Sequence, residues 1–159
     1  MPDITTEWRP RQELRVIALG LPFRTGKLLA SAVTEDNGIV KGWRPLGGGV
    51  EFGESVEHAL EREFAEELGA ETRVLSRLAV FENLFEHHGA KGHEIVFAFE
   101  VALDEPGLAS AEAFQMQDNG YVNNARWIPW TEFVEGRERL LPDGLLTLVE
   151  GLVPGGARA

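Results

Sequence analysis

The stretch from residue 47 to residue 70, GGGVEFGESVEHALEREFAEELGA, constrains this chain more than any other. Its opening glycines let the backbone adopt positive φ values and approach a ligand closely. Ser55 suits the N-cap of a helix and Gly69 suits the C′ position, so a helix is predicted between them. The helix places its apolar residues on one face: Leu60, Phe64 and Leu68. This face is expected to pack against a core.

Three glutamates lie beside that apolar face. At about 100° per residue, Glu63, Glu66 and Glu67 fall within roughly a 100° arc of the helix surface. Like charges three or four residues apart oppose helix formation by roughly 0.2–0.5 kcal/mol per pair, so their clustering is expected to serve a cation. Carboxylate oxygens suit Mg²⁺ or Mn²⁺ rather than zinc or copper. The alternative is a solvated acidic face, the commonest meaning of such runs.

The spacing of these residues carries a family resemblance. From Gly48 the chain reads Gly, five residues, Glu54, seven residues, and then Arg62-Glu63-Phe64-Ala65-Glu66-Glu67-Leu68-Gly69-Ala70. This order resembles the Nudix box, which runs here from Gly48 to Ala70, at every defined position. The chain is therefore similar to the MutT-like Nudix hydrolases, which implies a Nudix-type α/β/α sandwich with a mixed sheet. It also implies a divalent-metal-dependent pyrophosphohydrolase that cleaves a nucleoside diphosphate linked to another group, X.

The resemblance also implies roles for individual residues. The metal ligands for Mg²⁺ or Mn²⁺ would be Glu63, Glu66, Glu67 and the carbonyl oxygen of Gly48. Glu54 would support the site, and Arg62 would hold the glutamates by charge-assisted contacts. The expected catalytic set is thus Glu54, Arg62, Glu66 and Glu67. Substrate contacts are expected from Gly47, Gly48, Gly49 and Arg44, although Arg44 could instead be a solvated surface residue.

The sequence departs from the family where many relatives carry a further glutamate, before the last Trp-containing strand. Residues 120–125 contain no carboxylate here, and the amides of Asn123 and Asn124 cannot accept a proton from water. The general base is then either a box glutamate, with Glu66 favoured, or a carboxylate from elsewhere. The remaining candidates are Glu94, Glu100 and Glu112. A box glutamate such as Glu66 is favoured over a carboxylate from elsewhere, because metal coordination already lowers the pKa of the attacking water.

Substrate identity is less constrained. Residues 84–88 contain neither the proline common in ADP-ribose enzymes of the family nor the tyrosine of dinucleoside-polyphosphate enzymes. A nucleoside triphosphate, (d)NTP, or a small nucleotide derivative is therefore the leading candidate, and ADP-ribose or a nucleotide sugar is the alternative. A non-catalytic nucleotide-binding Nudix domain is a third hypothesis, but such domains typically lose box glutamates that this chain keeps.

Composition limits the other functions. A chain of 159 residues fits one domain, 1–159, with 1–12 and 153–159 expected to be flexible. A net charge of −11 argues against partners such as duplex nucleic acid or an anionic membrane, whereas metal ions would still allow a small phosphorylated nucleotide. No secretory signal or apolar span is apparent, and the absence of cysteine fits a reducing cytoplasm, so a cytoplasmic location is expected. Because Nudix proteins are often dimeric, the resemblance allows a homodimer.

Strands and helices are predicted along the rest of the chain. Strands are expected over 13–21, 28–33, 41–46, 73–86, 93–103 and 123–130, with a helix at 131–135 capped by Thr131 and a last helix at 144–152. Residues 104–120 are predicted to form a long loop. In the strand at 93–103, alternating residues predict one core face.

The histidines and tryptophans have modest predicted roles. His87 and His88 are expected to be exposed at a hairpin tip, with substrate contact as the alternative. His93 and Glu94 are expected to form a local hydrogen bond rather than a second metal site. Of Trp43, Trp127 and Trp130, two are expected to be buried anchors, whereas stacking on a nucleobase is the alternative.

Overall fold

Eight strands form one mixed sheet in the computed structural model, which describes residues 9–35, 37–104, 113–118 and 121–153. The strands are β1 (Leu14–Arg24), β2 (Lys27–Thr34), β3 (Val40–Arg44), β4 (Leu46–Gly49), β5 (Thr72–His87), β6 (Ala90–Leu103), β7 (Ala113–Asp118) and β8 (Tyr121–Pro129). The helices are α1 (Val56–Leu68), α3 (Trp130–Val134) and α4 (Leu145–Val149). The order of strands is β5-β6-β1-β2-β8-β7, with β4 paired to β1 and β3 paired to β2.

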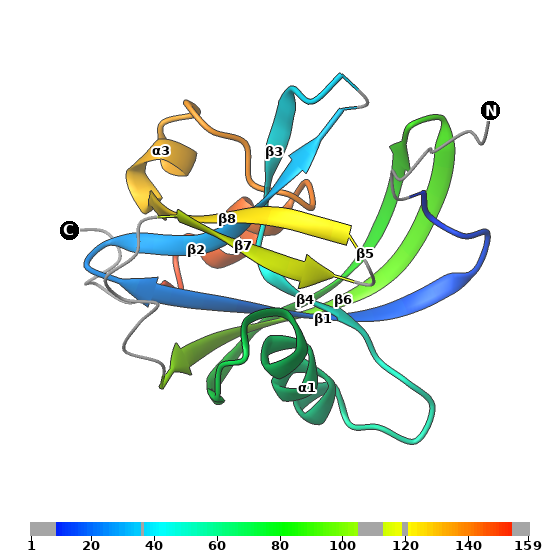
Figure 1. Cartoon of the computed structure of the whole chain (residues 1–159), viewed down its shortest axis with the longest axis horizontal. Coiled ribbons are helices and arrows are strands. Elements are labelled where there is room, and N and C mark those ends of the chain that lie inside the picture. The colour runs from blue at the N-terminus through cyan, green and yellow to red at the C-terminus, as the bar shows by residue number, and fades with distance from the viewer. Residues whose placement is uncertain (1–8, 36, 105–112, 119–120, 154–159) are drawn as a thin grey trace.

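The first two strands part after their turn, and this divergence opens the middle of the sheet. β1 and β2 pair only through Phe23 with Leu28 and Arg24 with Lys27. Further along, β4 pairs with β1 and β3 pairs with β2. On its other edge β1 pairs with β6, and this pairing is parallel. The two halves of the sheet therefore face each other across the gap between β1 and β2 (Figure 1).

Helices cover both faces of the sheet, which confirms the expected α/β sandwich. On one face the box helix α1 packs Leu60 and Phe64 into a core with Ala18 and Phe99. On the other face lies a second core, which α3 and α4 build together with β1 and β2: Trp130, Phe133, Leu145, Val149, Leu21 and Leu28. Figure 1 shows α1 on the opposite side of β1 from α3. The long apolar run of β1 is explained by burial on both sides.

A glycine in β1 sets how closely α1 approaches the sheet. A Cβ atom at Gly20 would stand 2.6 Å from a ring carbon of Phe64. Since real Cβ atoms do not come so near a ring, only glycine lets the helix sit at this depth.

Strand β6 has two buried faces rather than the single core face predicted. Phe99 and Val101 pack towards α1, as expected from the alternation. Val96 and Ala98, on the opposite face, are also fully buried. The reason is that the core under α1 covers one face of this part of β6 and the cores on the opposite side of the sheet cover the other.

Several boundaries differ from the predictions. Residues 113–118 of the predicted loop form β7, because they pair antiparallel with β8. Helix α3 begins one residue earlier than expected, with Pro129 as N-cap, so Thr131 does not cap it. Most of the ends predicted to be flexible lie outside the described residues, although Val153 is buried in the second core. In the part of the chain that the structure describes, no helix is long and apolar enough to cross a membrane.

Candidate active site

The box helix begins and ends where the sequence predicts. The Ser55 hydroxyl oxygen accepts a hydrogen bond from the backbone N–H of His58 at 3.1 Å, which satisfies one N–H of the first turn. At the other end Gly69 has φ 65°, and its N–H donates to the carbonyl oxygen of Ala65. These two caps fix the length of α1, and so they fix where its glutamates lie.

The three glycines of β4 bring the backbone against other groups. Gly47 has φ 144°, and a Cβ there would collide with the carbonyl oxygen of Ala18 on the neighbouring strand. At Gly48 a Cβ would stand 2.5 Å from the carboxyl carbon of Glu63. At Gly49 it would stand 2.7 Å from a guanidinium nitrogen of Arg15. The glycines therefore admit one carboxylate and one guanidinium group directly onto the backbone.

Arg62 is the hydrogen-bonding centre of the box. Its Nε and Nη2 atoms donate to the two carboxylate oxygens of Glu54 at 2.8 and 2.9 Å, a bidentate pair. Nη2 also donates to the carbonyl oxygen of Gly49 at 3.0 Å. Nη1 donates to Glu63 at 3.0 Å and reaches Glu66 at 3.4 Å. One side chain thus links the glycine strand, the loop before α1 and two of the helix glutamates.

This network shifts the acidity of its members. The hydrogen bonds from Arg62, followed by the one from the backbone N–H of Glu51, lower the pKa of Glu54 from 4.5 to about 2. The same contact with Glu54 raises the pKa of Arg62 above its ordinary value. Both groups are therefore charged across the physiological range.

The three helix glutamates lie in different environments. The Glu63 carboxylate rests on Gly48, the side chain of Glu66 is 58% exposed, and Glu67 is only 6% exposed. Within the described residues, no three carboxylate or histidine side chains gather closely enough to hold a metal ion. The expected tight cluster is therefore not formed, because Arg62 engages Glu63 and Glu66 while Glu67 is buried. The donors nevertheless suit Mg²⁺ or Mn²⁺ in kind, since all are oxygens on one helix beside a glycine backbone.

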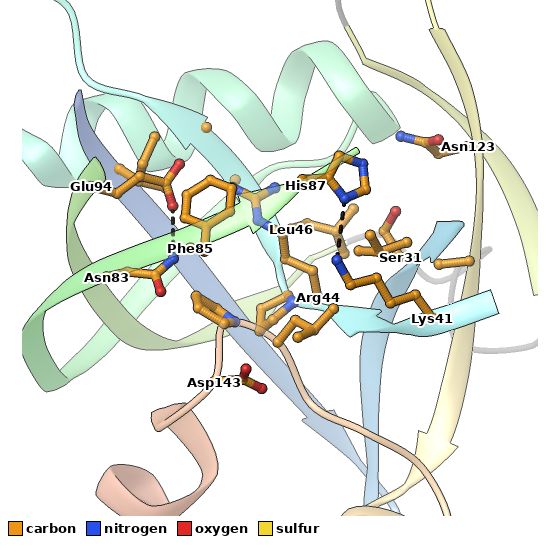
Figure 2. Close-up of a pocket in the computed structure, with 18 of the residues that line it drawn as sticks. Ser31, Lys41, Arg44, Leu46, Asn83, Phe85, His87, Glu94, Asn123 and Asp143 are labelled. Atoms are coloured by element: carbon orange, nitrogen blue, oxygen red, sulfur yellow. Dashed lines mark hydrogen bonds between the residues drawn. The ribbon is translucent and has the colours of Figure 1, made fainter. Parts of the chain in front are cut away.

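A pocket of about 820 Å³ lies between the two halves of the sheet, next to the box. Its lining includes Glu67 and all three glycines of β4. Four basic side chains also line it: Arg15, Lys41, Arg44 and Arg139, the last of which is paired with Asp143. Figure 2 shows Arg44 and Lys41 on the side of the pocket formed by the strands before the glycines. In a chain with net charge −11, basic groups gathered here suit an anionic ligand.

The histidine predicted to be exposed lies in this pocket instead. His87 is 8% exposed, and its Nδ1 lies 3.4 Å from the ammonium nitrogen of Lys41. Burial, aided by the nearby His88 and Lys41, lowers the pKa of His87 from 6.5 to about 4. A neutral imidazole can accept a hydrogen bond from the ammonium group at neutral pH. The prediction failed because β5 extends through His87 and leaves a turn of only two residues.

His93 and Glu94 point to opposite faces of β6 and do not bond to each other, contrary to the prediction. His93 pairs with Glu82 at 2.9 Å on the outer face. Glu94 is buried on the pocket face, where it accepts a hydrogen bond from the amide nitrogen of Asn83 at 3.2 Å. Successive side chains of a strand alternate between faces, which accounts for the separation.

The other predicted residues divide into those at the pocket and those away from it. Glu94 and Asn123 line the pocket, whereas Glu100 and Asn124 do not, and Glu112 lies outside the described residues. Trp43, Trp127 and Trp130 are all buried in the two cores, one more than predicted. Sequence reasoning missed Arg15, Lys41 and Asn83. Arg15 and Asn83 could have been indicated only by the pairing of β1 with β6 and of β6 with β5, which brings these strands to one surface. Lys41 lies on β3, whose pairing with β2 is equally absent from local sequence.

Comparison with known proteins agrees with this architecture. The family model of the NUDIX domain matches residues 13–147. The nucleoside triphosphatase NudI of Escherichia coli O139:H28 is 45% identical over 56 residues, which is 35% of this chain and 40% of that protein. The match thus spans less than half the length of that relative. The low-salt glycan biosynthesis protein Agl8 of Haloferax volcanii is 29% identical over 120 residues, 67% of this chain and 75% of Agl8.

Solved structures share the fold at low sequence identity. The solution structure of the E. coli ORF135 protein has a TM-score of 0.54 and 24% identity, and the match covers 87% of each chain. A MutT protein from Bacillus halodurans has a TM-score of 0.55 and 18% identity, over 76% of this chain and 72% of that one. The family model spans most of the sequence and includes the whole box. The chain therefore belongs to the Nudix hydrolase family.

Proposed function

We propose that this chain is a divalent-metal-dependent pyrophosphohydrolase that cleaves a nucleoside diphosphate linked to another group. The observation that carries the proposal is that residues of the box line a pocket that also contains basic side chains. Glu67 and the glycine strand line the same 820 Å³ space as Arg15, Lys41 and Arg44. A diphosphate in this space could bind to the glycine backbone and to the basic side chains. The box carboxylates would lie beside it, where they could hold a metal ion.

The metal would be held by the helix carboxylates. Glu63, Glu66 and Glu67, with the carbonyl oxygen of Gly48, supply the hard oxygen ligands that Mg²⁺ and Mn²⁺ prefer. Such an ion neutralises charge on the phosphates and makes a bound water more acidic. Arg62 would orient the carboxylates, since it already donates to Glu63 and Glu66. Glu54 would in turn keep Arg62 in place through their bidentate contact.

The chain's own residues divide the remaining tasks. Arg15 and Arg44 would bind phosphate oxygens, and forked guanidinium groups suit that role. We assign the general base to Glu66, whose exposed side chain can move between Arg62 and a reacting water. Glu94 is the alternative base, because it lines the pocket, whereas Glu100 does not.

A nucleoside triphosphate is the leading substrate. The relative with 45% identity over 56 residues is named a nucleoside triphosphatase, which favours this class, although the match spans only 40% of that protein. A nucleotide sugar or ADP-ribose remains the alternative class. A cytoplasmic location, a homodimer and the absence of nucleic-acid partners remain predictions from the sequence.

A hydrolysis screen with Mg²⁺ tests the proposal. Nucleoside triphosphates are supplied with inorganic pyrophosphatase, and nucleotide sugars or ADP-ribose with alkaline phosphatase, so that each cleavage releases phosphate. We expect turnover of one class. Excess EDTA should abolish it when the nucleotide products are measured directly by chromatography, because EDTA also inhibits the metal-dependent coupling enzymes. A Glu67→Gln variant is the control for contaminating activity. Binding of a nucleotide without any release would instead support the non-catalytic alternative.

A further inference from the structure

A polar row crosses three adjacent strands on the pocket face of the sheet. Asn83 of β5 lies opposite Glu94 of β6, and Glu94 lies opposite Arg15 of β1. All three residues line the large pocket. The preceding row, Phe81, Val96 and Ile17, is apolar and packs as a small core. Polar residues that follow an apolar row and face a pocket are in a position to contact a ligand.

The row is buried, and its hydrogen-bonding capacity is only partly used. Glu94 is 6% exposed and Asn83 is 8% exposed. Within the part of the chain that the structure describes, Glu94 accepts one hydrogen bond, from Asn83, and forms no ion pair. Arg15 directs its guanidinium group to Gly49 instead. An ionised carboxylate accepts several hydrogen bonds, so most of the capacity of Glu94 stays available to a ligand.

An aromatic ring lies next to this row. Phe85 is two residues beyond Asn83 on the same face and lies opposite Gly92. A Cβ at Gly92 would collide with the Phe85 ring, so the glycine allows the ring to lie against the strand. Figure 2 shows Phe85 beside Glu94 and Asn83. A flat apolar surface beside hydrogen-bond acceptors suits a planar heterocycle.

The row also lies at a useful distance from the glycines. Gly49 pairs with Ile17 of β1, and β6 is the next strand beyond β1. At about 4.8 Å per strand, Glu94 is two strands, or roughly 10 Å, from the glycine strand. A diphosphate at the glycines would therefore leave room for a ribose before its base reached Glu94.

We infer that Glu94 and Asn83, with Phe85 as a stacking surface, form a base-recognition subsite that selects guanine nucleotides. The inference rests on the proposed function for the position of the phosphates. Guanine has two adjacent donors, N1–H and the exocyclic amine, which match the two oxygens of a carboxylate. Adenine and cytosine place a ring-nitrogen acceptor beside their amine, and uracil flanks its single N–H with carbonyl oxygens. Each of these edges would set an acceptor against the carboxylate of Glu94.

Binding of nucleoside monophosphates, without metal, tests the subsite separately from catalysis. Isothermal titration of the full chain with GMP, AMP, CMP and UMP should give roughly ten- to hundredfold tighter binding for GMP. Glu94→Gln should remove this preference, because an amide offers one acceptor and one donor and so matches adenine or cytosine instead. Asn83→Ala should weaken the preference in the same direction. Glu82→Gln is the matched control, since Glu82 neighbours Asn83 in sequence but pairs with His93 on the outer face.

The outcomes separate the subsite from the proposed activity. Equal affinity for the four monophosphates, binding of none of them, or an equal loss in Glu82→Gln would overturn the inference. Selective binding of GMP by a chain that cleaves no nucleotide would sustain the subsite and refute the hydrolase proposal. Cleavage of triphosphates without preference for the base would support the hydrolase proposal and refute the subsite.

Discussion

Alanine substitutions at two neighbouring glycines should affect different properties. Gly47→Ala should lower stability, and Gly48→Ala should lower activity. Gly47 has φ 144°, and its Cβ would meet the backbone of Ala18, which cannot move without breaking the β1–β4 pairing. A residue forced into such a conformation costs about 1–3 kcal/mol. For a domain of this size each kcal/mol lowers Tm by roughly 2–4 °C, so Gly47→Ala should lose roughly 2–12 °C.

Gly48→Ala is expected to behave differently because its obstacle can move. Its Cβ would stand 2.5 Å from the carboxyl carbon of Glu63, the far end of a flexible side chain. Rotation of Glu63 relieves the contact at little cost to the fold, so Tm should change by less than about 2 °C. The rotation also takes Glu63 away from Arg62 and from the proposed metal, so activity and Mn²⁺ affinity should fall by roughly 10- to 100-fold.

Thermal unfolding followed by circular dichroism, titration with Mn²⁺, and the phosphate-release assay measure the three quantities on both variants. The reasoning would be refuted by a Gly48→Ala protein that unfolds as early as Gly47→Ala while keeping its metal dependence. It would also be refuted by a Gly47→Ala protein with unchanged Tm, since the collision with Ala18 would then cost nothing.

Further predictions concern the charged groups. Glu66→Gln and Glu67→Gln should each lower kcat strongly and leave Tm nearly unchanged, because removing one carboxylate relieves repulsion between like charges. Large losses of Tm without a selective loss of activity would show that the two residues are structural. Arg62→Ala should lower both kcat and Tm, as it leaves the carboxylates that it binds unpaired; stability equal to that of the parent chain would contradict this. Stability should also decline as pH falls from about 6.5 to about 4, because burial keeps His87 neutral in the folded state while the unfolded chain takes up a proton. His87→Gln should flatten that part of the Tm profile, and an unchanged slope would assign the decline to other groups.

The box helix could be predicted from sequence because its signals are local. Ser55, Gly69 and the apolar spacing between them determine both ends and the buried face within one short segment. The glutamates could be assigned to this helix from sequence. Their different environments could not be predicted, because these depend on where Arg62 is held by its hydrogen bonds to Glu54 and to the carbonyl oxygen of Gly49.

Features that depend on pairing between distant strands were harder to predict. Residues 113–118 carry no strong strand pattern, and they become β7 because β8 offers them an edge. The burial of His87 follows from the unexpected length of the β5–β6 hairpin. The row of Asn83, Glu94 and Arg15 depends on the register of β5 with β6 and on that of β6 with β1. Neither register can be read from local spacing in the sequence.

The parallel pairing of β1 with β6 has a consequence for folding. Residues 14–22 pair with residues 93–101, so one edge of β1 must wait for a partner from the far half of the chain. Contacts between such distant segments form slowly, because a long loop must close first. During synthesis β1 will expose an unpaired edge until β6 has left the ribosome, and such edges favour aggregation. A chain that ends before residue 93 should therefore associate with other copies rather than remain as a folded monomer.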